Sequence, residues 1–173
     1  VDITERKLAE ARIAHLNAVL RGIRDVNQLI TRERDPRALI DRACELLVES
    51  SGVETSCILV FERDSVERVA ATALAGEVSG LRAFLADGHV PDCVRAAVAG
   101  RAAVVRQSGP QGCAGCALEG SCSGRWDVVA LPLQTDGQIR GAMLSTLPRD
   151  VAAAPDDIEL LEEVASDVAF ALR

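Results

Sequence analysis

The sequence predicts an α+β domain that has antiparallel strands in its middle and a long helix at each end. Two pairs of apolar runs are each joined by turn residues, Arg63-Asp64-Ser65 in the first pair and Asp136-Gly137 in the second, so each pair is expected to form a hairpin. Residues 1–34 and the residues after Pro155 instead carry apolar side chains at steps of three and four, which indicates helices. A chain of 173 residues is long enough for one well-buried core.

The first helix is expected from about residue 5 to residue 34. Its apolar row steps alternately by four and three, as in a coiled coil: Ala9, Ile13, Leu16, Leu20, Ile23, Asn27 and Ile30. A buried Asn such as Asn27 commonly fixes a parallel dimer, so the row favours a homodimer through the terminal helices. The alternative is an ordinary amphipathic helix that packs on one sheet. His15 lies outside the row and is expected to be a solvated helix residue.

The middle of the chain alternates between helical and extended patterns. Pro36 ends the first helical pattern, and Asp35 is placed to cap the next one. The elements expected after it are helix 38–49, strands 55–61 and 67–74, helix 79–86, a helix that begins near residue 91 and ends at residue 100, and strand 102–106. Cys44 and Cys57 fall within a helix and a strand, so both are expected to be core residues.

The last part of the chain predicts a second hairpin followed by a helix. Strands are expected over 126–133 and 138–147, and Gly141 marks a place where another backbone can approach closely. Pro155 and the two acids after it suit the first turn of a helix. That helix carries a second apolar stripe: Ile158, Leu161, Ala165, Val168 and Leu172.

Four cysteines form the candidate site. Cys113, Cys116 and Cys122 lie in a Gly- and Ser-rich loop, and Cys93 lies near the start of an earlier helix. Four thiolates satisfy tetrahedral zinc or a [4Fe–4S] cluster, so the sequence predicts a metal site on these residues. His89 is an alternative ligand.

Two other readings of the cysteines stay open. Cys113 could form a reversible disulfide with Cys116 or Cys122, beside the cation Arg125. The thiols could instead fold a loop over a pocket for a small-molecule ligand, or be inert. The cofactor is therefore unknown at this stage, with zinc, an iron–sulfur cluster and a small ligand as candidates.

Composition excludes several classes of function. A net charge of −7 and an aromatic content of 2% leave no basic face or stacking platform for nucleic acid. No apolar run approaches the roughly 20 residues that span a bilayer, so no membrane contact is expected from this segment and a cytoplasmic location is predicted. The sequence has no Ser/His/Asp set and no phosphate-binding glycine loop, so the domain is not expected to be an enzyme.

The closing hairpin and the helix after it resemble a known family. The run Val129-Ala130-Leu131-Pro132-Leu133, the turn Asp136-Gly137 and the run Arg140-Gly141-Ala142-Met143-Leu144, followed by a helix near Pro155-Asp156, are similar to a GAF domain of bacterial signalling proteins over residues 36–173. The opening residues 2–7 resemble the exit segment of a PAS domain, which commonly precedes GAF domains in sensor kinases of two-component systems. The resemblance implies a central antiparallel sheet with the terminal helices on one face and a pocket under loops on the other.

The resemblance divides the chain into a signalling helix (1–34) and a GAF domain (35–173). A subset of GAF domains pairs a Pro-x-Cys helix start with a Cys-x-x-Cys-Pro-Leu loop; here these are residues 91–93 and 113–118, with Ala117 in place of the proline. No cysteine is followed by His, so a bilin-binding light sensor is not expected.

The resemblance implies a sensory domain that detects a small ligand or redox state and relays it through dimeric helices. Free methionine sulfoxide reductases share the fold and use cysteines beside the late strand. No Cys–acid pair of that kind stands near residues 125–127, although Cys122 is close in sequence. A thiol reductase is thus one alternative, and a purely dimerising linker module is another.

Overall fold

The computed structural model describes residues 2–50, 52–63, 65–72, 77–107, 113–120, 126–149 and 154–173. In chain order the elements are α1 (Ile3–Arg32), α2 (Pro36–Ser50), β1 (Thr55–Glu62), β2 (Ser65–Thr72), α3 (Val78–Ala86), α4 (Asp92–Gly100), β3 (Val104–Gln107), β4 (Trp126–Thr135), β5 (Gln138–Pro148) and α5 (Pro155–Ala171). Their order is the predicted one, and most boundaries differ by one or two residues. Asp35 accepts a hydrogen bond from the Arg37 amide at 3.1 Å, as expected for the start of α2.

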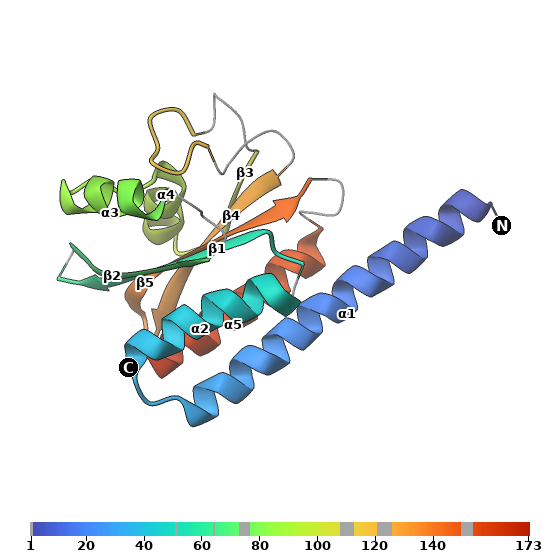
Figure 1. Cartoon of the computed structure of the whole chain (residues 1–173), viewed down its shortest axis with the longest axis horizontal. Coiled ribbons are helices and arrows are strands. Elements are labelled where there is room, and N and C mark those ends of the chain that lie inside the picture. Colours follow the sequence, from blue (N-terminus) through green and yellow to red (C-terminus); the bar gives the residue numbers. More distant parts are fainter. Residues whose placement is uncertain are drawn as a thin grey trace.

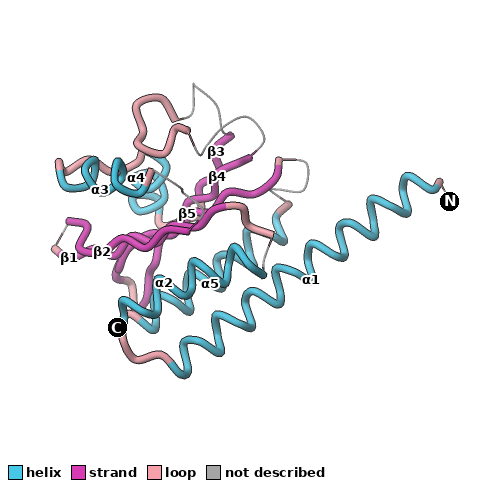
Figure 2. The backbone as a smooth tube through the Cα atoms, viewed as in Figure 1, coloured by secondary structure: helices cyan, strands magenta, loops and turns pink. Residues whose placement is uncertain are grey.

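The five strands form one sheet in the order β2-β1-β5-β4-β3, and every neighbouring pair is antiparallel. Helices α1, α2 and α5 cover one face, and α3 and α4 cover the other (Figure 1). The tube in Figure 2 shows the same three layers. The predicted α+β fold, with the terminal helices on one face of an antiparallel sheet, is confirmed.

The second hairpin follows the chemistry of its turn. Asp136 and Gly137 both have positive φ, 52° and 73°, which matches the twist that a two-residue hairpin needs. Beyond the turn, Gly141 of β5 stands opposite Val60 of β1. A methyl group on Gly141 would overlap the carbonyl oxygen of Leu59, so the predicted close approach of another backbone is confirmed.

The sheet separates two apolar clusters because neighbouring side chains on a strand point to opposite faces. On β1, Ile58 and Val60 pack with the terminal helices, whereas Cys57 and Leu59 pack under α3 and α4. Cys57 is 2% exposed and Cys44, on α2, is fully buried, so the expectation that both are core residues is confirmed.

The apolar row of α1 divides into two parts. All of residues 2–11 are exposed, and Ile13 and Leu20 remain 58% and 51% exposed. Ile23 is 7% exposed and lies in the domain's own core, against which Ile30 also packs. The N-terminal part of α1 therefore extends away from the rest of the chain (Figure 1).

The stripe of α5 is covered within the chain. Leu161, Ala165 and Val168 belong to the core beneath the sheet, and Ile158 and Leu172 pack against it. An exposed apolar residue of α5, Phe170, lies outside the stripe and is 56% exposed. The stripe thus serves to attach α5 to its own sheet.

His15 is not the solvated residue that the sequence predicts, and that expectation is wrong. Its side chain is 9% exposed, and its Nε2 lies 2.7 Å from Oδ1 of Asp157 at the start of α5. Helical spacing places His15 outside the apolar row, but it does not reveal that another helix supplies a buried carboxylate opposite it.

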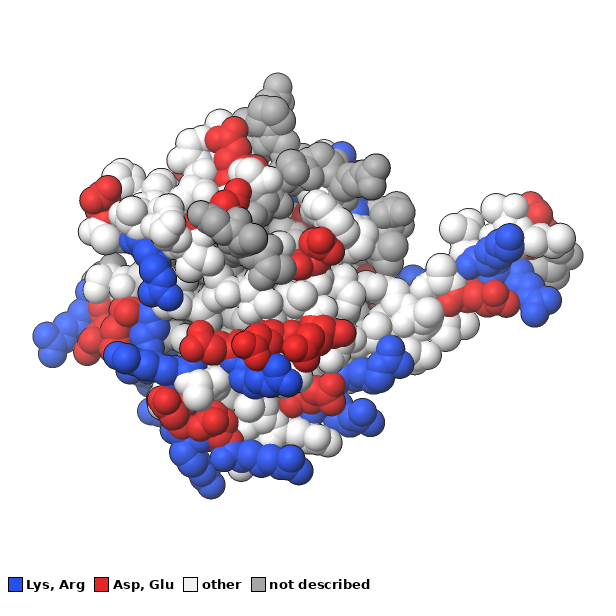
Figure 3. All heavy atoms as spheres, in the orientation of Figure 1, with Lys and Arg blue, Asp and Glu red and all other residues white. Residues whose placement is uncertain are grey.

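The surface of the described residues is mixed in charge on the side that Figure 3 shows, where acidic and basic side chains stand close together over α1 and α2. Several of them pair, as Arg42 does with Glu45 at 2.7 Å. Among the described residues no helix is both long enough and apolar enough to cross a membrane. The division of the chain between residues 34 and 35 stays a prediction.

Candidate functional site

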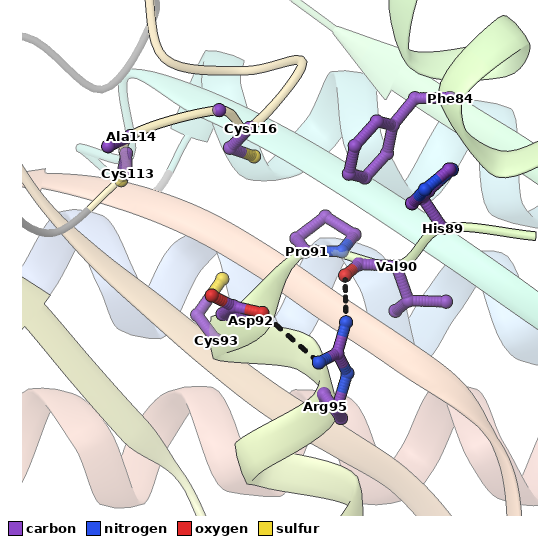
Figure 4. A pocket seen from close by; sticks show the side chains of 11 residues that line it. Phe84, His89, Val90, Pro91, Asp92, Cys93, Arg95, Cys113, Ala114 and Cys116 are labelled. Carbon is purple, nitrogen blue, oxygen red and sulfur yellow. Dashed lines mark hydrogen bonds and ion pairs between the residues drawn. The ribbon is translucent and has the colours of Figure 1, made fainter.

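A cavity of about 190 Å³ lies on the face of the sheet opposite the terminal helices. It is enclosed by the end of α3, the loop before α4, the first turn of α4 and the cysteine loop (Figure 4). The residues that line it are Phe84, His89, Val90, Pro91, Asp92, Cys93, Arg95, Cys113, Ala114, Gly115 and Cys116. Three of the four cysteines predicted to form a site therefore border one cavity.

Cys93 is positioned by the start of α4. Pro91 occupies the N-cap position with φ −51° and ψ 138°, so the helix begins at Asp92 and Cys93 falls in its first turn. Arg95 is held at the rim, because its Nη1 lies 3.4 Å from Oδ1 of Asp92 and its Nη2 donates to the carbonyl of Val90 at 3.3 Å. This turn presents a thiol and a guanidinium to the same cavity.

The cysteine loop is shaped by a tight turn. The Cys116 amide donates to the carbonyl of Cys113 at 3.0 Å, and Gly115 between them has φ +76°. Leu118, which is 4% exposed, anchors the end of the turn in the apolar cluster under α3 and α4. Gly115 thus permits the tight turn between the two thiols, because glycine adopts positive φ without steric cost.

Two of the thiols at the cavity, Cys93 and Cys116, have raised pKa values. The pKa of Cys93 is raised to about 11, chiefly by burial and also by negative charge on Cys116 and Cys113, while the Val94 amide acts in the opposite direction. Burial also raises the pKa of Cys116. Cys93 is therefore a neutral thiol near pH 7, and the shift at Cys116 also favours the neutral thiol.

The four-thiol metal centre stays a prediction. Cys93 approaches the cavity from α4, while Cys113 and Cys116 approach from the loop on its other side (Figure 4). Cys122 lies outside the described residues. Within the described ranges, no three His, Cys, Asp or Glu side chains are arranged so that they could hold a metal ion. Metal binding at Cys93, Cys113 and Cys116 would therefore require the loop to close on α4.

Two ring side chains complete the wall. His89, the alternative metal ligand, lies beside Phe84 with ring centroids 5.2 Å apart and planes inclined by 29°. Phe84 and Arg95 were not predicted as site residues. Phe84 falls in a short helical pattern and Arg95 in a different helix, so only the packing of α3 and α4 on one face reveals that they meet.

The family model of the GAF domain matches residues 33–173. The chain belongs to the GAF domain family. No curated protein matches it by sequence.

Solved structures with this fold include both signalling domains and an enzyme. The GAF domain of a phosphoenolpyruvate-protein phosphotransferase from Coxiella burnetii has a TM-score of 0.67 at 11% identity and covers 91% of this chain and 94% of its own. The GAF domain of a putative sensor histidine kinase from Pseudomonas syringae pv. tomato has a TM-score of 0.57 at 16% identity, with 97% and 93% covered.

The enzyme is the free methionine-R-sulfoxide reductase from Neisseria meningitidis, solved in complex with its substrate. Its TM-score is 0.59 at 16% identity, and the match covers 86% of this GAF domain and 84% of the reductase. At such identities the likeness shows a shared fold alone.

Proposed function

We propose that this GAF domain is the sensory domain of a cytoplasmic signal-transduction protein, and that the cavity beside Cys93 detects a small ligand or redox state. The observation that carries the proposal is the meeting of three thiols, from α4 and from the cysteine loop, at one cavity that also holds Arg95 and His89. A sensory site needs a cavity with a few convergent polar groups, and this one has both. A preceding PAS domain and a kinase output are part of the same proposal.

The cavity limits the ligand. Its volume of about 190 Å³ is below the roughly 300–1,000 Å³ usual for drug-sized ligands, so the ligand has few heavy atoms. Phe84 and Val90 offer apolar contacts, while Arg95 and Asp92 offer a cation and an anion at the rim, 3.4 Å apart. These groups favour a small molecule with an apolar part and a polar or charged group that can share this ion pair.

Zinc or an iron–sulfur cluster on Cys93, Cys113, Cys116 and Cys122 is the metal form of the proposal. A metal ion would displace the thiol protons and draw the loop toward α4, which gives the binding event a structural consequence. We propose metal analysis with a visible spectrum on anaerobically purified protein, and the same on Cys93→Ser and Cys44→Ala. Metal that is lost in Cys93→Ser and kept in Cys44→Ala would support the four-thiol metal centre. Absence of metal from the parent chain and from both variants would rule the metal centre out.

The redox form of the proposal predicts a disulfide within the cysteine loop or across the cavity. Mass spectrometry after alkylation, before and after a mild oxidant, distinguishes the two pairings. Cys44 is the internal control because it is fully buried and lies on the other side of the sheet. If neither metal, ligand nor oxidant changes the protein, the sensory proposal fails and the purely dimerising linker module remains.

The relay is proposed to run through a homodimer in which a second copy covers the exposed row of α1. Ile13 and Leu20, one heptad apart, are more than half exposed, although such side chains are normally covered in coiled coils. A doubly substituted Ile13→Glu, Leu20→Glu protein should be monomeric by light scattering where the parent chain is a dimer. Arg24→Glu is the matched control. A monomeric parent chain would contradict the proposed relay.

A thiol reductase is the second candidate, and the three cavity thiols together with the fold shared with the Neisseria meningitidis enzyme favour it. The assay is reduction of free methionine-R-sulfoxide with thioredoxin and NADPH. Turnover that disappears in Cys93→Ser or Cys113→Ser and persists in Cys44→Ala would replace the sensory proposal. The raised pKa values of Cys93 and Cys116 argue against either of these two thiols as a resting nucleophile.

A further inference from the structure

A buried carboxylate joins the two terminal helices. Asp157, in the first turn of α5, is 1% exposed. Its Oδ2 accepts from Nη1 of Arg12 at 2.6 Å, and its Oδ1 lies 2.7 Å from Nε2 of His15. Both partners come from α1, and they stand 145 and 142 residues away in the chain. We call Arg12, His15 and Asp157 the Asp157 cluster.

The cluster stands where the extended part of α1 reaches the domain. Residues 2–11 are all exposed, and Arg12 and His15 are the first side chains of α1 that are not. The first fully covered residue, Val19, comes only two turns after Arg12. A Cβ on Gly52, just beyond α2, would lie 3.1 Å from Nδ1 of His15, so the imidazole is also packed against the segment after α2.

The ion pairs of the Asp157 cluster favour one rotation of α1 about its own axis. Arg12 and His15 are three residues apart and so lie on one face of the helix. Rotating the helix by one residue, about 100°, would carry both away from Asp157 and leave a buried carboxylate without its partners. Smaller rotations are also unfavourable, because a buried carboxylate that loses one of its partners destabilises the folded state.

We infer that the Asp157 cluster is a coupling joint that holds the extended part of α1 rigid and at a fixed rotation on the start of α5. Residues 2–11 are all exposed, and short isolated helices are marginal in water, so burial within the described part of the chain does little to keep them helical. Anchored at Arg12, the extended part can transmit a rotation of α1 to α5. This role in signalling rests on the proposed function, whereas the rigid joint itself does not.

The test is ¹⁵N relaxation on the full chain carrying Ile13→Glu and Leu20→Glu, so that no second copy covers α1, with and without Asp157→Asn. Backbone order parameters of residues 5–15 should fall from ~0.85 to below about 0.6, while those of β1, β4 and β5 stay unchanged. Arg6→Gln is the matched control, because it removes an exposed ion pair of α1, Arg6 to Glu10 at 3.0 Å, and should change nothing. If Asp157→Asn does not fold, the double substitution Arg12→Gln, His15→Gln should cause the same loss of order in residues 5–15.

Unchanged order parameters in residues 5–15 of the folded variant would overturn the joint. An equal loss of order in the sheet would also overturn it, because the cluster would then support the whole fold and not α1 in particular. The experiment needs no ligand, metal or oxidant. A failure of the joint is therefore distinguishable from a failure of the sensory proposal, because the sensory proposal is tested separately by the metal, alkylation and turnover measurements at the cavity.

Discussion

Substituting Gly141 by alanine tests the register of the sheet at its centre. Gly141 lies on β5, which is hydrogen-bonded to β1 on one side and β4 on the other. An added methyl group would overlap the carbonyl oxygen of Leu59 and would lie 3.1 Å from its carbonyl carbon and 3.2 Å from Cα of Val60. All three atoms belong to the backbone of β1, so no side chain can rotate away to make room.

The expected cost follows from that rigidity. Extra methyl groups in well-packed cores cost about 1–3 kcal/mol, and a contact with backbone alone belongs at the upper end, so we expect a loss of about 3 kcal/mol. For a chain of this size this corresponds to a fall in Tm of roughly 6–12 °C. The measurement is urea denaturation followed by far-UV circular dichroism, with the midpoint and slope fitted separately.

Gly80→Ala is the matched control for this substitution. Gly80 lies in α3, and a Cβ there would meet no atom within 4 Å. The variant should be more stable by about 0.5–1 kcal/mol, because alanine is the better helix former. Equal stability of Gly141→Ala and the parent chain would show that β1 and β5 do not approach as the register of Val60 opposite Gly141 requires.

Three further predictions concern the turn, the core and the buried thiols. Gly137→Ala should lower the free energy of unfolding, measured by urea denaturation, by about 1 kcal/mol, because the φ of +73° at Gly137 disfavours a side chain. An unchanged free energy of unfolding would contradict the turn geometry. Leu131→Ala should lower the free energy of unfolding by about 2–5 kcal/mol, because Leu131 is fully buried beneath the terminal helices. If the loss were smaller than that of Leu8→Ala, a substitution at an exposed residue, Leu131 would not belong to the core. Burial raises the pKa of Cys44 from 9.0 to about 12. The contribution of the buried Cys44 thiol to the free energy of unfolding is therefore fully present below pH 9. Above pH 9, Cys44 loses its proton in the unfolded chain but keeps it in the folded chain, so the free energy of unfolding falls by about 1.4 kcal/mol per pH unit. Denaturation of Cys44→Ala between pH 8 and pH 10.5 should show a shallower fall, and an identical slope would mean that Cys44 is not buried as described.

Local chemistry was sufficient to predict the elements of this domain from its sequence. The turn Asp136-Gly137 requires positive φ at both positions, which Gly and Asp tolerate, and the runs on either side then pair. Gly141 stands out because a strand interior rarely uses glycine without a close neighbour. Cys44 and Cys57 follow from the apolar periods around them. Each of these conclusions depends only on residues within about one turn or one strand.

The tertiary structure decided which surfaces meet. Helical spacing showed that α1 and α5 carry apolar stripes, but the stripe of α5 packs on its own sheet, while Ile13 and Leu20 of α1 remain exposed. His15 and Asp157 are 142 residues apart, so no local pattern pairs them. The cavity likewise needs α3, α4 and the cysteine loop on one face. Periodicity says which side chains share a face, whereas the neighbour that covers that face is chosen by burial across the whole chain.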